Sequence, residues 1–136
     1  MIALSEPHRL SRQVKISMRG LANEPFILFP RSLAPELHDQ IISLCQRARF
    51  SPRVVQEAMQ LPTIVSLVAA GIGVAIIPAS LQNLGRAGVN YRTIRESTPK
   101  AELVVAWRAE PPSALLQSFL HVVTEEGNIE RATEPS

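Results

Sequence analysis

The hydrophobic residues of this chain follow two alternating patterns. Continuous apolar runs occur at residues 26–29, 74–77 and 103–107, and short runs of this kind are typical of buried strands. Between the first two runs, apolar residues recur at the i, i+4, i+7 and i+8 positions of one helix face: Leu37, Ile41, Leu44 and Cys45. Strands that alternate with helices predict an α/β fold with a mainly parallel sheet flanked by helices.

The stretch from Gln60 to Leu84 combines the clearest of these signals. Pro62 suits the first helical position, and the apolar residues after it leave little polar face, so this helix is expected to be covered on most sides. Gly71 stands where a left-handed residue ends a helix. A strand buried on both faces of a parallel sheet is then expected at 74–77, and Pro78 is expected to end it and to start another helix.

The other segments carry weaker signals. A polar loop with an exposed His8 is expected at 5–11, one helical turn at 18–23, and a connector at 95–100. Strands are expected at 1–4, 53–58 and 89–94, and the Val54-Val55 pair favours a covered strand. His38 is expected to face solvent on its helix. Ser113 is expected to cap a final helix whose apolar face consists of Leu115, Leu116, Phe119, Leu120 and Val123.

Composition excludes several classes of protein. The 136 residues are 46% apolar and include one cysteine, Cys45, which indicates a single domain in a reducing cytoplasm without internal disulfides. No apolar run is long enough to span a bilayer. The formal charge of +2 does not predict a nucleic-acid surface. No catalytic motif or metal-ligand spacing is present, so we expect a binding protein rather than an enzyme, with no metal and no cofactor.

Two loops suit a small anionic ligand. Pro30-Arg31-Ser32 follows a strand, and Gln60-Leu61-Pro62-Thr63 opens a helix whose first N–H groups are free to donate. Together with the Thr63 hydroxyl and the Arg31 guanidinium, they would suit a carboxylate. Alternatively, Ser32 caps the helix expected to begin near Leu33, Thr63 satisfies local backbone groups, and Arg31 is solvated. The pattern alone does not decide between these interpretations.

The segment AMQLPTIVSLVAAGIGVAIIPASLQ resembles the effector-binding domain of LysR-type transcriptional regulators. EPFILFP, FSPRVVQEA, GVNYRTI and ELVVAWR extend the resemblance, in order and spacing, from Ile2 to about Val123. It implies a periplasmic-binding-protein-like lobe. Residues 1–126 would form a partial effector-binding domain, and residues 127–136 a flexible tail. Within that domain, the second lobe is expected at about 12–100, and the crossover strands and closing helix at about 1–10 and 101–126. The family's N-terminal DNA-binding domain and most of its first lobe are then expected to be absent from this chain.

The resemblance also implies a site and partners. A small effector, such as an organic acid, is expected in a cleft between lobes, against Pro30, Arg31, Ser32, Gln60, Leu61 and Thr63. Homo-oligomers are expected, with DNA bound only through the domain that this chain lacks, and no membrane. Two alternatives remain open, which are a free-standing solute-binding lobe and an interaction module that dimerises with full-length regulators.

Overall fold

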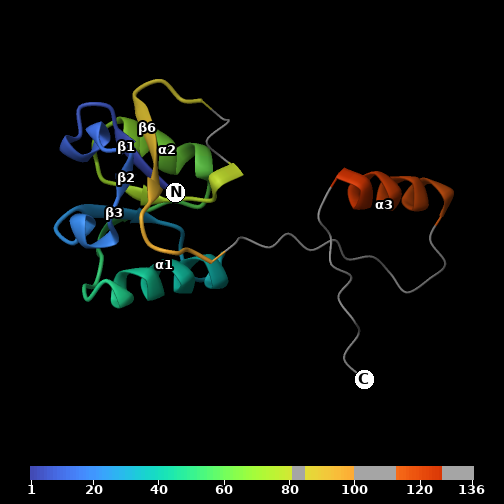
Figure 1. Ribbon diagram of the computed structural model, residues 1–136, viewed down its shortest axis with the longest axis horizontal. Helices are drawn as coiled ribbons and strands as arrows, with labels where there is room; N and C mark the ends of the chain where they lie inside the picture. The colour runs from blue at the N-terminus through green and yellow to red at the C-terminus, as the bar shows by residue number, and fades with distance from the viewer. Residues whose placement is uncertain (81–84, 100–112, 127–136) are drawn as a thin grey trace. The chain divides into compact units, whose positions relative to one another are not determined.

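The computed structural model describes residues 1–80, 85–99 and 113–126. The chain forms two compact units, residues 1–101 and 102–136, and each is described by itself (Figure 1). In the first unit the strands are β1 (Ile2–Ser5), β2 (Lys15–Ile16), β3 (Pro25–Leu28), β4 (Arg53–Glu57), β5 (Ala75–Ile76) and β6 (Val89–Ile94). Its helices are α1 (Pro35–Arg47), α2 (Leu61–Ala69) and the 3-10 helices η1 (Arg9–Arg12) and η2 (Met18–Leu21). The second unit contributes α3 (Ala114–Glu126).

The strands form a four-stranded sheet in the order β2-β6-β1-β5 and a parallel pair, β3 and β4. β2 and β6 are parallel, and a parallel bridge between Phe26 and Val74 joins β3 to the start of β5. β1 runs antiparallel to both of its neighbours, β5 and β6. The α/β fold is therefore confirmed, and the expected all-parallel surroundings of the strand at 74–77 are corrected, because its ladder with β1 is antiparallel.

Alternate side chains of the strands enter two different hydrophobic clusters, as the period of a strand requires. Phe26 and Leu28 of β3 lie in one cluster with the α1 residues Ile41, Leu44 and Cys45. The intervening Ile27 lies in the other cluster, together with Ile64, Val65 and Val68 of α2. Figure 1 accordingly shows α1 and α2 on opposite sides of the strands. The apolar stripe predicted for α1 is confirmed, whereas α2 buries one face only, and Pro62 and Thr63 are exposed.

The turn between α2 and β5 depends on two glycines. Gly71 ends the helix with φ of +76°, which confirms the predicted left-handed residue. At Gly73 the backbone passes so close to β3 that a Cβ atom would lie 2.7 Å from the carbonyl oxygen of Pro25. Only glycine fits at this crossing.

Several expectations for loops and surfaces are wrong. Residues 5–11 are not a loop throughout, because η1 begins at Arg9, and His8 is half-buried: its Nδ1 accepts from the Leu10 amide and its Nε2 lies 3.2 Å from Glu24 Oε2. His38 is also largely covered, with 17% of its side chain exposed. The valines of β4, by contrast, are not covered, and Val54 is 41% exposed, because β3 is the only strand that pairs with β4 among the described residues.

The predictions for helix starts and caps are confirmed in part. α1 begins at Pro35 rather than near Leu33, and Ala34, not Ser32, occupies its N-cap. The expected helical turn at 18–23 is present as η2. In the second unit, Ser113 caps α3 as predicted, since its Oγ accepts from the Leu116 amide at 3.3 Å. The strand expected at 103–107, part of the helix expected after Pro78, and the tail at 127–136 lie outside the described residues.

Candidate functional site

The two predicted ligand loops begin at the same edge of the β3–β4 pair. β3 and β4 are parallel with Leu28 opposite Glu57, and the Ala58 amide donates to the Leu28 carbonyl at 3.1 Å. The carboxyl ends of the two strands therefore lie side by side, and each leads directly into one of the loops. Phe29, Ala58 and Ile64 belong to one buried cluster, with Ala34 and Leu61 packed against it. This cluster fixes the bases of both loops.

The second loop presents the start of α2 to solvent. Gln60 is the N-cap residue in an extended conformation and makes no side-chain cap, and the first backbone bond of the helix runs from the Ile64 amide to the Gln60 carbonyl. The N–H groups at Leu61 and Thr63 precede that bond, and helices leave such groups without intrahelical acceptors. The Thr63 side chain is exposed beside them. The Ser66 hydroxyl, the other hydroxyl of this helix, donates to the Pro62 carbonyl at 2.6 Å.

The first loop places its cation in an internal ion pair. Arg31 Nε and Nη2 donate to the two carboxylate oxygens of Asp39, each at 2.8 Å. The hydrogen bonds from Arg31 lower the pKa of Asp39 from 3.8 to about 2. Both side chains are more than half exposed, so the pair is open to water and can exchange partners. Ser32 is exposed within a turn that closes from the Leu33 amide onto the Pro30 carbonyl at 3.0 Å.

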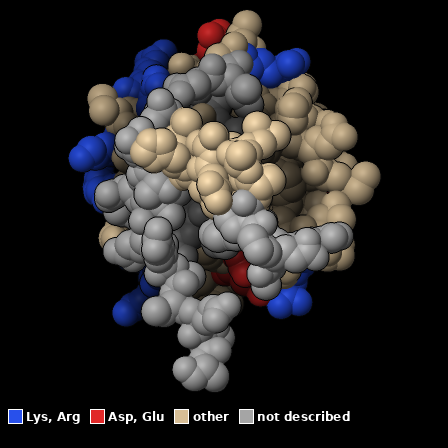
Figure 2. Space-filling model, turned by 90° about the vertical axis from the view of Figure 1, so that its right-hand side faces the viewer, with Lys and Arg blue, Asp and Glu red and all other residues tan. Residues whose placement is uncertain are grey.

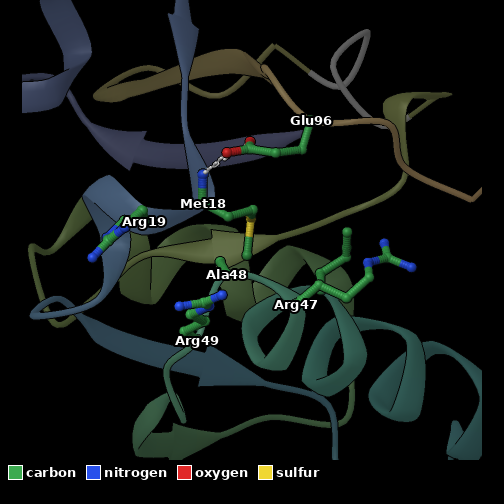
Figure 3. Close-up of a pocket in the computed structure, with 7 residues that line it drawn as sticks. Met18, Arg19, Arg47, Ala48, Arg49 and Glu96 are labelled. Atoms are coloured by element: carbon green, nitrogen blue, oxygen red, sulfur yellow. Dashed lines mark hydrogen bonds between the residues drawn. The ribbon is translucent and has the colours of Figure 1, made fainter.

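A pocket that the sequence did not predict lies elsewhere on the first unit (Figure 3). It has a volume of about 280 Å³, and it is lined by η2, the last turn of α1 and Glu96, which follows β6. None of the six predicted ligand residues lines it. The sequence pattern does not set its Arg19, Arg47 and Arg49 apart from the other arginines. The one local signal was an arginine, Arg49, directly after a helix, at a position where glycine is usual.

The described surface shows neither a metal cluster nor a membrane-spanning helix. Within the described ranges, no three side chains of His, Cys, Asp or Glu gather in a way that could hold a metal ion. Likewise, no described helix has both the length and the apolar character needed to cross a bilayer. Figure 2 shows Lys or Arg as well as Asp or Glu side chains of the described residues at the surface.

Comparisons with known proteins agree on one family. A family profile described as the LysR substrate binding domain matches residues 1–128. The chain is 38% identical to the HTH-type transcriptional regulator IlvR of Caulobacter vibrioides over 122 residues, which are 90% of this chain and 41% of IlvR. The chain thus spans about two fifths of the length of that relative.

Solved structures show the same fold. HinK, a LysR family transcriptional regulator from Pseudomonas aeruginosa, matches with a TM-score of 0.74 and 21% identity over 92% of this chain and 43% of HinK. The BenM effector binding domain, solved with its effector benzoate, matches with a TM-score of 0.67 and 19% identity over 96% of this chain and 62% of that chain. These likenesses confirm the predicted periplasmic-binding-protein-like α/β fold.

Proposed function

The chain belongs to the LysR substrate-binding domain family and is an effector-binding domain of a LysR-type regulator, and from that premise we propose that its effector is a small carboxylate held against residues 30–32 and 60–63. The observation that carries the proposal is the parallel register of β3 and β4, which brings both loops to one sheet edge. In open α/β sheets, ligands bind beyond the carboxyl ends of strands.

The start of α2 carries the hydrogen-bond donors that would bind an anion. Its free N–H groups and the positive end of the helix dipole favour a carboxylate, and the exposed Thr63 hydroxyl adds a donor beside them. Gln60 and Leu61 flank this position and offer an amide and an apolar contact. The benzoate of the BenM structure is an effector of this chemical class, and it supports a carboxylate here.

Arg31 contributes through exchange of partners. Its guanidinium fork is bonded to Asp39, and an exposed ion pair of this kind has little net stability. A ligand carboxylate presents the same two-oxygen geometry to the fork, so it can take the place of Asp39. Ligand binding would then release Asp39 in the second turn of α1 and pass a local change into that helix.

The link between the effector site and DNA binding is a separate part of the proposal. Because the relatives are HTH-type regulators, we propose that the effector site controls DNA binding by a separate domain in an oligomer. The same relatives favour a regulator over a free-standing solute-binding lobe. Effector binding would favour one arrangement of paired domains, and the differential affinity for the two arrangements sets the size of the response.

The test is a titration of the 136-residue chain carrying ¹³C-methyl methionine, with benzoate as the first probe. Met59 is 71% exposed and adjoins Gln60, so its methyl signal reports on the site. We expect a saturable shift of Met59, with an affinity about three- to tenfold weaker in Thr63→Val and in Arg31→Gln.

The matched controls are Thr98→Val and Arg53→Gln, which remove the same groups from exposed positions outside the two loops. They should leave the affinity unchanged. If Met59 does not respond to benzoate or to a series of small aliphatic mono- and dicarboxylates, or if its response survives Thr63→Val and Arg31→Gln in full, the proposed site is wrong.

A further inference from the structure

The pocket in Figure 3 has an apolar floor. Met18 and Leu44 line it, and they are 1% and 5% exposed in the whole chain. Ala48, the C-cap residue of α1, completes the floor, and Figure 3 shows the Met18 side chain reaching toward it. At about 280 Å³ the pocket lies below the usual range for drug-sized ligands, so it suits a molecule with a small apolar body.

Three guanidinium groups surround this floor. Arg19 comes from η2, whereas Arg47 and Arg49 come from the end of α1. Within the described residues, none of these guanidinium groups has an ion pair, in contrast to Arg9 with Glu24 and Arg31 with Asp39. They are therefore available to an anionic group of a ligand.

The backbone holds one of these arginines in place. Arg49 has φ of +64°, a conformation that non-glycine residues rarely adopt, and it is the only such non-glycine residue in the described chain. Backbone hydrogen bonds on both sides maintain it: the Arg49 amide donates to Gln46 at 2.9 Å and the Phe50 amide to Cys45 at 3.1 Å. This helix end is closed by an arginine where a glycine would fit without strain.

The pocket also carries one negative group. Both carboxylate oxygens of Glu96 accept from the Met18 amide, at 3.0 and 3.1 Å. In Figure 3, Glu96 lies on one side of Met18, while Ala48 and Arg49 lie on the other. A single N–H group does not saturate a carboxylate, which has about four acceptor positions. Glu96 can therefore accept further hydrogen bonds from a cation in the pocket.

We propose that this pocket binds a small zwitterion, an α-amino acid with an apolar side chain. Its carboxylate would pair with Arg47, its ammonium group with Glu96, and its side chain would cover Met18 and Leu44. The site shares no residue with the loops at 30–32 and 60–63, and it lies at the opposite end of α1. For a helix of 13 residues that separation is about 20 Å.

The test again uses the ¹³C-methyl methionine signals of the whole chain, because Met18 lies in this pocket and Met59 lies beside the other site. The probes are L-leucine, 4-methylpentanoate, which lacks the ammonium group, and 3-methylbutan-1-amine, which lacks the carboxylate. We expect L-leucine to shift Met18 saturably without shifting Met59. Each analogue should bind about three- to tenfold more weakly, the loss expected for one exposed charge pair.

Variants separate recognition from structure. Arg47→Gln should weaken leucine and 4-methylpentanoate alike, while the matched Arg53→Gln on β4 should change neither. Glu96→Gln keeps an oxygen that accepts from the Met18 amide, so it should reduce leucine to the affinity of 4-methylpentanoate and leave 4-methylpentanoate unchanged. Unperturbed Met1 and Met59 signals establish that each variant is folded, and the two ligand analogues test the same charge pairs on the unsubstituted chain if a variant is not.

The proposal is overturned if leucine produces no saturable shift of Met18 up to its solubility. It is also overturned if 4-methylpentanoate binds as well as leucine, or if Glu96→Gln weakens both probes equally, since Glu96 would then act only on the backbone of η2. A response of Met59 to benzoate, or its absence, does not bear on any of these outcomes.

Discussion

The substitution Gly73→Ala tests the packing on which the candidate effector site depends. Gly73 lies between the end of α2 and β5, where the backbone crosses β3. An added Cβ would lie 2.7 Å from the carbonyl oxygen and 3.1 Å from the carbonyl carbon of Pro25, and 3.2 Å from Cγ1 of Ile27. Two of these three atoms belong to the backbone, so no side-chain rotation removes the clash.

The cost follows from what must move. The crossing is flanked by hydrogen bonds from the Val74 amide to the Pro25 carbonyl, at 2.8 Å, and from the Ile27 amide to the Val74 carbonyl, at 2.9 Å. Separating the two segments weakens both bonds, each with a net contribution of about 0.5–1.5 kcal/mol. Overpacking adds about 1–3 kcal/mol. These terms overlap, so we expect Gly73→Ala to lower the free energy of unfolding by about 2–4 kcal/mol.

Urea unfolding followed by circular dichroism measures this loss, and two other glycines serve as controls. At Gly71 an added Cβ meets no atom within 4 Å, so Gly71→Ala should lose only the cost of φ of +76°, about 1–2 kcal/mol. At Gly20 the nearest atom is the Ser17 hydroxyl oxygen at 3.6 Å, and Gly20→Ala should stay within about 0.5 kcal/mol of the parent. If Gly73→Ala costs no more than Gly71→Ala, the close crossing of β3 does not exist.

Two further predictions concern titrating groups. Burial raises the pKa of the Cys45 thiol from 9.0 to about 11. The thiol therefore ionises at a lower pH in the unfolded chain, and the free energy of unfolding should fall as the pH rises from about 9 to about 11. The urea midpoint of a Cys45→Ala variant should lack this fall. Asp39, the only aspartate, has a pKa lowered to about 2, so its pairing is complete above pH 3.8 and is lost as the pH falls toward 2. A ¹³C titration of its carboxyl group should move back toward 3.8 in Arg31→Gln, and an unchanged pKa would contradict the ion pair.

Local periodicity predicted the elements but not the directions of the strands. The α1 stripe and the helix-ending Gly71 depend on neighbours within a few residues, so the sequence contains the information for them. The antiparallel course of β1 depends on where Ile2 meets Ile76 and Arg92, far away in the chain. The exposure of Val54 has the same origin. Two adjacent valines indicate a strand, but the strand's position at the edge of the sheet determines whether their side chains are covered.

The ion-pair partners of charged residues are even harder to predict from local sequence. In the sequence, Arg31 stands in a loop after a strand, where both a ligand contact and a solvated side chain fit the pattern, and nothing singles out Arg47 or Arg49. The structure gives Arg31 an internal partner, eight residues away, and it gives Arg47 and Arg49 none among the described contacts. What distinguishes the two helix-end arginines is the arrival of Glu96 and Met18, 78 positions apart in the chain, at the same pocket. We infer that an arginine is suited to bind a ligand where the tertiary fold leaves it without an ion-pair partner and places apolar side chains beside it. Neither condition can be inferred from the residues next to it in the sequence.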